Sequence, residues 1–309
     1  MNAQCHKVIA TMPVRGVLRR NEPMARHTVW AVGGLAQNMF LPADLEDLSA
    51  FLAGQEPRTR LFWMGLGSNL LVRDGGLAGT VINTSGRLNK LYLLHANTVR
   101  AEAGVACAKV AKFAARNDLT GAAFFAGIPG TVGGALAMNA GAFGGETWPL
   151  VNAVETMDFA GRVRVRRASD FKYGYRCVSG LAGEWFVAAH LELPSGDGDA
   201  ERDDIRSLLK QRGLTQPIGQ RSCGSVFQNP EGDFAGRLIE TAGLKGRRVG
   251  CAVVSSKHAN FIINEGGATA ADIENLISEV RSVVERTQGV VLTSEVRVVG
   301  CTEPVGGEA

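Results

Sequence analysis

The sequence has few cysteines and no long hydrophobic run. Its six cysteines are scattered, without a CxxC pair or a nearby histidine cluster, at Cys5, Cys107, Cys177, Cys223, Cys251 and Cys301. This pattern is typical neither of a zinc site nor of a disulfide framework, so we expect no bound metal. Because no apolar segment is long enough for a membrane helix and no signal peptide is evident, we expect a protein of the reducing cytoplasm.

A strong excess of charge is also missing. The chain carries 33 Lys and Arg against 30 Asp and Glu, a formal net charge of +3, and its basic residues are dispersed. This balance argues against a nucleic-acid partner and suits an anionic small molecule. With 45% hydrophobic residues in 309, the chain can build two or three domains with cores of their own, and we expect a monomer.

Three familiar loop motifs are absent. In the segment Gly65–Leu70 a leucine stands where a dinucleotide-binding GxGxxG loop needs its third glycine, and no helix pattern follows. Neither GxxxxGK[ST] nor GxSxG occurs. The sequence therefore gives no support for a Rossmann fold, a P-loop or a hydrolase nucleophile elbow.

Glycine is abundant, with 39 residues, and it concentrates in two loops at 65–69 and 127–134. Consecutive backbone N–H groups in such loops can form a nest that holds a diphosphate without Lys or Arg. Two tight turns in a crowded core would give the same pattern, and the residues alone leave both interpretations open.

Periodicity and turn residues predict an α+β protein. Residues 1–26 show no periodicity and are interpreted as an N-terminal leader, and the polar, glycine-rich segment 194–199 is interpreted as a linker. We therefore expect one domain over 27–195, made of two subdomains, and a second over 196–309. Helices are predicted at 44–52, 107–117, 205–212, 234–242 and 271–288, and strands at 30–41 with a break at Gly33–Gly34, 61–64, 70–72, 80–83, 99–103, 153–159, 163–167, 186–193, 224–228, 249–254, 260–264 and 290–299.

Ordered motifs give a sharper prediction. They are GSN at 67–69, LLVRDGG at 70–76, AGIPGTVGG at 126–134, MNAGAFGG at 138–145, Tyr175-Arg176, GSVFQNP at 224–230, AGRLIE at 235–240, AGLKG at 242–246, KHANF at 257–261 and SEVR at 294–297. In this order, across nearly the whole chain, they resemble the UDP-N-acetylenolpyruvoylglucosamine reductase (MurB) family. The short distance from Arg176 to Ser225 resembles the class of that family without an extra substrate-covering insertion. Some positions depart from the family pattern, namely Leu35, Val178, Arg221 and Cys251.

The resemblance implies a fold and a reaction. The fold is a vanillyl-alcohol-oxidase (PCMH) type FAD-binding domain of two α/β subdomains, followed by a C-terminal α+β substrate domain. The reaction, in peptidoglycan precursor synthesis, is reduction of UDP-N-acetylglucosamine enolpyruvate to UDP-N-acetylmuramate, with FAD as cofactor and NADPH as co-substrate. Hydride goes from reduced FAD to the enolpyruvyl methylene carbon.

By the same resemblance, Ser225 is the proton donor, and Arg176 and Glu295 flank the substrate carboxylate. Tyr175, Asn229 and Arg297 are expected to contact the substrate. The residues expected to bind FAD are Gly65, Leu66, Gly67, Ser68, Asn69, Leu70, Gly127, Pro129, Gly130, Thr131, Gly133, Gly134, Asn139 and Gly141.

Two other functions remain as alternatives. The first is an FAD-dependent oxidase of the same fold that acts on another substrate and returns electrons to oxygen. The second is a non-catalytic nucleotide-binding module in which Arg176, Ser225 and Glu295 are structural. Rapid flavin reduction by NADPH, followed by reoxidation by the enolpyruvyl nucleotide rather than by air, distinguishes the reductase from both.

Overall fold

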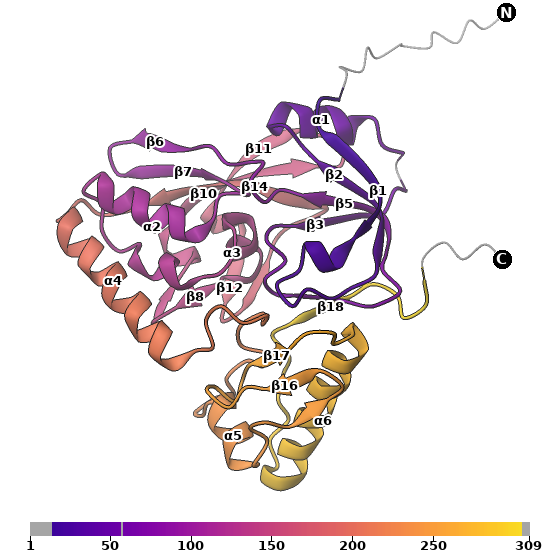
Figure 1. Ribbon diagram of the computed structural model, residues 1–309. Coiled ribbons are helices and arrows are strands. Elements are labelled where there is room, and N and C mark those ends of the chain that lie inside the picture. Colours follow the sequence, from indigo (N-terminus) through magenta and orange to yellow (C-terminus); the bar gives the residue numbers. More distant parts are fainter. Residues whose placement is uncertain (1–13, 57, 305–309) are drawn as a thin grey trace, which may run out of the picture.

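A computed structural model describes residues 14–56 and 58–304, which form three units (Figure 1). Residues of all three units line a shared cavity. The first unit is a four-stranded sheet in the order β1-β2-β5-β3, made of β1 (Val17–Pro23), β2 (Leu35–Leu41), β5 (Leu77–Asn83) and β3 (Leu61–Met64). Strand β1 is antiparallel to β2, whereas β2, β5 and β3 run parallel. Helix α1 (Leu45–Ala53) packs on this unit and begins after its N-cap Asp44, the first residue of the helix predicted over 44–52, whose side chain accepts from the amide of Asp47.

Strand β1 lies within the stretch interpreted as a leader. Residues 1–13 of that stretch are outside the described residues, whereas 17–23 form an edge strand and 24–26 the 3-10 helix η1 (Met24–Arg26). The first five residues of β1 are exposed, and Arg19 and Arg20 are among them. A polar strand exposed on both faces has no apolar alternation, so periodicity could not reveal it. The strand predicted from Trp30 likewise begins only at Leu35.

The second unit is a five-stranded antiparallel sheet, and helices cover one of its faces. Its order is β11-β10-β14-β7-β6, with β11 (Val163–Arg167), β10 (Val151–Asp158), β14 (Glu184–Glu192), β7 (Thr98–Glu102) and β6 (Leu91–His95). The helices are α2 (Cys107–Arg116), η2 (Ala123–Gly127) and α3 (Val132–Met138). Shorter elements follow in this unit, namely η3 (Trp148–Leu150), η4 (Ala168–Asp170) and the hairpins β8 (Gly141–Ala142)/β9 (Gly145–Glu146) and β12 (Lys172–Gly174)/β13 (Cys177–Ser179).

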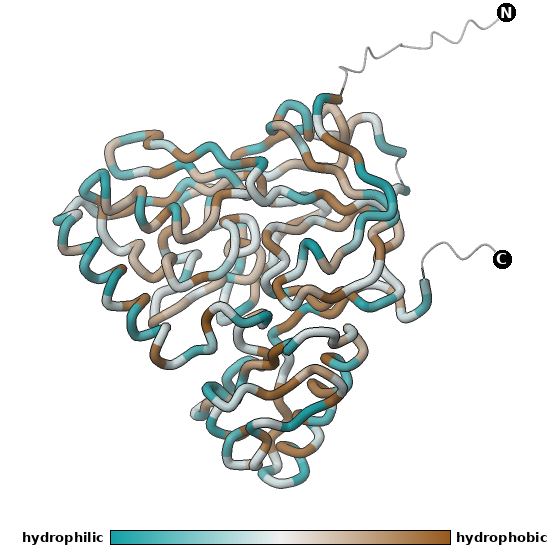
Figure 2. Tube along the Cα trace, in the orientation of Figure 1, coloured by the Kyte–Doolittle hydropathy of each residue, from teal (hydrophilic) through white to brown (hydrophobic). Residues whose placement is uncertain are grey.

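Helix α4 (Gly198–Thr215) connects the second unit to the third (Figure 1). It follows the predicted linker and packs on α2 and η2, where Ile205 and Leu208 join the core of the second unit. The hydrophilic residues along its length stand out in Figure 2. The division of the chain at residues 195 and 196 stays a prediction. Helix α4, the first helix after residue 196, packs on the second unit, which belongs to the predicted FAD-binding domain.

The third unit is a small sheet covered by two helices. It contains β15 (Arg248–Val249), β16 (Ala252–Val254) and β17 (Ile262–Asn264), with α5 (Ala235–Thr241) and α6 (Ala270–Gln288). Helix α6 begins with a capping box formed by Thr269 and Asp272 and ends at Gly289 in the left-handed conformation. Asp272 and Arg286 lie in its first and last turns, where their charges match the helix dipole.

The chain then returns to the first unit. Strand β18 (Arg297–Val299) pairs in parallel with β4 (Leu70–Val72). The strand predicted over 290–299 is thus confined to its last residues, and the strand predicted over 224–228 is wrong except for one bridge from Phe227 to Ser294. These segments run through the crowded space between units, where apolar side chains are buried without a neighbouring ladder.

In the described ranges, none of the helices has the length and apolar character needed to cross a membrane. The same ranges contain no group of three or more His, Cys, Asp or Glu placed to hold a metal ion.

Candidate active site

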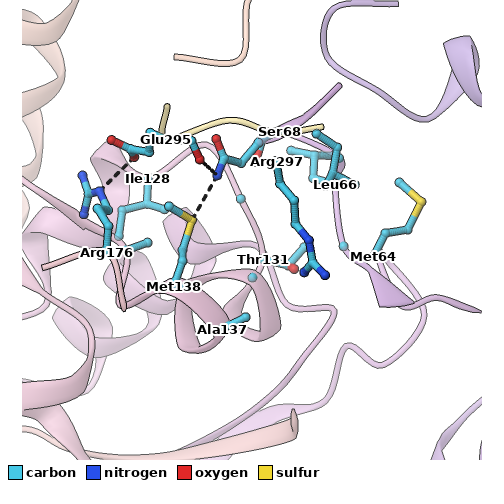
Figure 3. Close-up of a pocket in the computed structure, with 18 of the residues that line it drawn as sticks. Met64, Leu66, Ser68, Ile128, Thr131, Ala137, Met138, Arg176, Glu295 and Arg297 are labelled. Atoms are coloured by element: carbon cyan, nitrogen blue, oxygen red, sulfur yellow. Dashed lines mark hydrogen bonds and ion pairs between the residues drawn. The ribbon is translucent and has the colours of Figure 1, made fainter. Parts of the chain in front are cut away.

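The two glycine loops face each other across a cleft (Figure 3). The first leads from β3 to β4, and the second leads from η2 into α3. A Cβ atom at Gly65 would lie 2.1 Å from Thr131 Oγ1, and one at Gly130 would lie 3.4 Å from Ser68 Oγ. Glycine is therefore needed at position 65 for the loops to approach this closely.

The cleft consists of adjoining cavities that share lining residues. Two cavities of about 280 Å³ each have Ser68, Asn69, Arg176 and Glu295 in common. A third, of about 290 Å³, continues past Gly65 toward the stacked rings of Trp63 and Trp185. Such an elongated and branched cleft can hold an extended dinucleotide together with a second ligand.

The donors of the first loop fit a diphosphate. Within the described chain no hydrogen bond uses the amides of Leu66, Gly67 or Ser68, and the buried Thr131 Oγ1 also has no partner. Gly67 and Thr131 are buried, and since buried donors normally find acceptors, their free groups mark a place for the oxygens of a ligand, with the more exposed amides of Leu66 and Ser68 beside them. Gly67 has φ +70°, and a Cβ there would lie 2.1 Å from the carbonyl oxygen of His27.

The second loop contributes less than the sequence suggested. The amides of Gly130, Val132 and Gly133 donate to the carbonyls of Ile128, Val105 and Ala103. These three amides are therefore not available to an anion, whereas no hydrogen bond within the described residues uses the amides of Thr131 and Gly134, which remain available together with the Thr131 hydroxyl. Thirteen of the expected FAD-binding residues line the cleft, namely Gly65, Leu66, Gly67, Ser68, Asn69, Leu70, Gly127, Pro129, Gly130, Thr131, Gly133, Gly134 and Gly141.

Asn139, the remaining predicted cofactor residue, is fully buried. Its Oδ1 accepts from the amide of Trp148 at 3.0 Å, and its Nδ2 donates to Glu146 and to the Gly174 carbonyl. Its contact with FAD stays a prediction. The sequence reasoning missed several residues of the cleft because apolar side chains carry no chemical motif, namely Trp63, Met64, Ile128, Ala137 and Met138.

Arg176 and Glu295 form an ion pair at one end of the cleft (Figure 3). Arg176 lies in the turn between β12 and β13 with φ +55°, and its Nε donates to Glu295 Oε1 at 2.8 Å. Its other nitrogens donate to the carbonyls of Asn139 and Gly141 at 3.4 and 3.2 Å. These bonds fix the guanidinium against the cavity wall that Ser225 also lines.

Both main-chain polar groups of Glu295 form hydrogen bonds that fix its position. Its amide donates to the Val226 carbonyl at 2.8 Å, and its carbonyl accepts from Asn69 Nδ2 at 3.0 Å. Burial raises the pKa of the Glu295 carboxyl, and Arg176 only partly opposes this rise. The carboxyl is therefore easier to protonate than an ordinary glutamate.

Ser225 lies between Gly224, which has φ +86°, and the buried Val226. The Val226 amide donates to the Asn260 carbonyl, and the Asn260 side chain bonds both the amide and the carbonyl of Phe227. The serine is thus carried by a segment that hydrogen bonds fix on its C-terminal side. Nearby, burial raises the pKa of the Cys223 thiol well above its ordinary value, which agrees with a packed and unreactive side chain.

Of the three residues predicted to contact the substrate, Tyr175 and Asn229 lie together between the second and third units, and Arg297 lies apart from them in the cleft. Tyr175 OH accepts from the Asn229 amide at 3.4 Å, and Asn229 Oδ1 accepts from Ala235 N at 3.1 Å, which links the second and third units. Arg297 extends into the cleft beside Thr131 (Figure 3). It lines the two cavities that Ser225 does not line, so its expected contact with the substrate stays a prediction.

Comparison with known proteins shows the family. Residues 216–299 match "UDP-N-acetylenolpyruvoylglucosamine reductase, C-terminal domain", and residues 36–165 match "FAD binding domain". A UDP-N-acetylenolpyruvoylglucosamine reductase of Alkalilimnicola ehrlichii is 60% identical over 285 residues, which cover 92% of this chain and 95% of that protein. The chain belongs to the UDP-N-acetylenolpyruvoylglucosamine reductase family.

Other members agree with this assignment. The reductase of Methylococcus capsulatus is 58% identical over 288 residues, 93% of this chain and 95% of that protein. The crystal structure of the Thermus caldophilus reductase superposes with a TM-score of 0.79 at 32% identity, covering 93% of this chain and 99% of the other. The predicted family and α+β fold, with a PCMH-type FAD-binding domain and a C-terminal reductase domain, are therefore confirmed.

As a member of the reductase family, the chain is an oxidoreductase and a flavoprotein with FAD as its cofactor. NADPH is the co-substrate of the family.

Proposed function

We propose that this protein uses NADPH to reduce UDP-N-acetylglucosamine enolpyruvate to UDP-N-acetylmuramate, in peptidoglycan precursor synthesis in the cytoplasm, and that it acts as a monomer. The names of relatives 51–60% identical support the reaction. The observation that carries the proposal is the convergence of Arg176, Ser225 and Glu295 on one cavity beside the glycine loops.

FAD, when bound, supplies the hydride that adds to the methylene carbon of the enol ether. The residues that would hold it are those of the first loop, whose free amides would bind the diphosphate, together with Thr131 and the apolar side chains of Ile128 and Met138. Their arrangement leaves the cavity with Ser225 for the substrate.

Negative charge then develops on the substrate carbon next to the carboxylate, and the residues of the chain must stabilise it and protonate it. Arg176 is held in place by two carbonyls and offers a charge-assisted hydrogen bond to the carboxylate. Glu295, whose pKa is raised by burial, donates a second hydrogen bond when it is protonated. The Ser225 hydroxyl gives its proton to the carbanion-like carbon. This carbon is so strong a base that even a weakly acidic hydroxyl can protonate it when held beside it.

The test separates the two half-reactions. The purified protein is expected to be yellow, to lose its flavin absorbance with NADPH, and to recover it quickly with the enolpyruvyl nucleotide but slowly in air. Ser225→Ala should leave reduction by NADPH nearly unchanged and slow the substrate-dependent recovery by about 10³-fold, the scale typical of losing a positioned acid.

A matched control is Ser278→Ala on the exposed face of α6, which should change neither half-reaction. Equal loss in both half-reactions for Ser225→Ala would refute the role given to the hydroxyl. Fast recovery in air alone would support the oxidase, and a colourless protein would support the non-catalytic module.

A further inference from the structure

The cavity that contains Ser225 is lined by two cationic side chains, Arg176 and Arg212. Arg176 is paired with Glu295. Arg212 comes from the last turn of α4, and within the described ranges no carboxylate lies within ion-pair distance of it. The motifs of the sequence did not include Arg212, because a charged residue on a mostly exposed helix gives no signal of its own.

Arg212 is fixed by its neighbour. Its Nε donates to Gln216 Oε1 at 2.9 Å, and the Gln216 amide donates to the Arg212 carbonyl at 2.9 Å. Gln216 caps the C-terminal end of α4 and lines the same cavity. The backbone bond places Gln216 one turn beyond Arg212, and the Nε bond orders the Arg212 side chain while both terminal nitrogens of the guanidinium keep their donors.

Arg212 is a cationic side chain without an anionic partner among the described residues. It is partly buried, and burial lowers its pKa below the ordinary value with no carboxylate to offset the effect. A partly desolvated guanidinium without a partner is costly, and the cost is recovered when an oxyanion binds. A guanidinium fork matches phosphate oxygens in a bidentate manner.

We propose that Arg212, positioned by Gln216, binds the diphosphate of the nucleotide-sugar substrate. This inference rests on the proposed function, in which the substrate carries a carboxylate as well as a diphosphate. Arg176 and Glu295 flank the carboxylate, so the second cation of the cavity remains for the diphosphate. Helix α4, which packs on the second unit and ends where the third begins, thereby contributes to substrate affinity.

The test uses UDP and uridine as probes of the oxidised, FAD-loaded protein, with binding measured by calorimetry. Arg212→Ala should weaken UDP binding by about 10- to 100-fold, the scale of a lost charge-assisted hydrogen bond, and leave uridine binding unchanged. Arg212→Lys should lose less, because it keeps the charge but not the fork. Arg206→Ala, an exposed residue of the same helix paired with Asp203, is the matched control and should bind both probes normally.

Unchanged UDP binding in Arg212→Ala would overturn the proposal, and so would equal weakening of UDP and uridine, which indicates a collapsed pocket. Normal UDP binding with weaker binding of the enolpyruvyl nucleotide would assign Arg212 to the carboxylate and also overturn it. The visible flavin spectrum reports folding, and if the alanine variant loses FAD, Arg212→Lys and Arg212→Gln decide by the same criteria. Reoxidation of the wild-type flavin by the enolpyruvyl nucleotide tests the proposed function separately.

Discussion

At the scale of single residues, Glu295 shows how one side chain can meet opposing demands. Burial favours its neutral form, whereas the Arg176 guanidinium at 2.8 Å favours its anion, and burial has the larger effect. The same carboxyl can thus hold Arg176 in place when ionised and donate a hydrogen bond when protonated.

A pH profile of Glu295→Gln tests this interpretation. If the protonated form is the active one, substrate-dependent flavin reoxidation in the wild type falls as pH rises through the raised pKa of Glu295. Glutamine always keeps its N–H donors, so the variant should lose this fall, although its rate at low pH should be lower because the amide is a weaker donor. Stopped-flow absorbance measures both profiles. A fall that persists in the variant would assign the titration to another group.

Gly67 is a second residue with a decisive geometry. An alanine there meets the His27 carbonyl oxygen at 2.1 Å in a left-handed backbone. Gly67→Ala should therefore distort the first loop and reduce the FAD retained on purification by about 10-fold or more, since the loop amides would no longer converge.

Gly86 provides a matched control for Gly67, because its φ is +68° and a Cβ there has open space. Gly86→Ala should cost only the backbone strain, about 1–2 kcal/mol of stability, with normal FAD content. The absorbance ratio of flavin to protein, with thermal unfolding, distinguishes the two effects. Normal flavin content in Gly67→Ala would contradict the role of the loop.

At the scale of elements, helix α6 is fastened to the first unit at its N-terminus. Asp74, in the turn between β4 and β5, accepts from the amides of Ala270 and Ala271 at 2.9 and 3.0 Å. The adjacent Arg73 binds Glu274 through two nitrogens. A capping residue is thus supplied by a distant part of the chain, and it couples the position of the third unit to the loop region of the first.

Asp74→Ala should lower the free energy of unfolding by about 1–2 kcal/mol, because two helix N–H groups lose their acceptor. Glu274→Ala, which removes a partly exposed ion pair, should cost less than about 1 kcal/mol. Urea unfolding followed by circular dichroism measures both changes. An equal cost for the two variants would show that the cap contributes no more than the surface pair.

Elements with a strong local signal were predictable from the sequence. The bounds of β3, β4 and β11 match the prediction, as does the start of α1 at Asp44. Strand β6, with four exposed residues, gave no periodic signal, and α4 begins well before the predicted residue 205 because its first turns are polar. Residues 290–296 read as a strand because they are rich in β-branched and apolar residues, but only Leu292 and Val296 are buried, in the core that also contains Leu71 of the first unit, and no local pattern reveals such contacts.

The same distinction holds for the site. Arg176 and Glu295 were named only through a resemblance of ordered motifs, and the structure brings them together at 2.8 Å. Their separation of 119 residues could not be bridged by spacing arguments. The free amides of the first loop agree with the predicted nest, whereas in the second loop the amides of Val132 and Gly133 donate to Val105 and Ala103, in a neighbouring segment that no sequence pattern pairs with it.

At the scale of the whole molecule, the second sheet contains a buried ion network. Arg100 donates two hydrogen bonds of 2.6 Å to Glu155, and His190 lies 2.8 Å from the same carboxylate. Burial alone would raise the pKa of Glu155, but the hydrogen bonds from His190 and Arg100 outweigh it and lower the pKa to about 2. An acid with a lowered pKa in the folded state stabilises the fold above its unfolded pKa and loses that effect as pH falls.

The melting temperature should therefore fall as the pH drops from the ordinary glutamate pKa of 4.5 toward 2. In Glu155→Gln the neutral-pH melting temperature should be lower, because the buried Arg100 loses its two short charge-assisted hydrogen bonds and keeps only the 3.3 Å contact with Glu102, and the dependence on acid pH should be flatter. Glu240→Gln, in an exposed pair with Lys245, serves as the control with a wild-type profile. Scanning calorimetry over this range measures the effect, and parallel curves for wild type and Glu155→Gln would contradict it.

The return of the chain from the third unit to the first has a consequence for biosynthesis. Glu295 lies two residues before β18, and its carbonyl receives a hydrogen bond from Asn69, 226 positions earlier. A nascent chain can assemble the glycine loops long before this carboxylate leaves the ribosome. The protein can therefore form its glycine loops early, but its active site is complete only when β18 pairs with β4 and brings Glu295 to Arg176.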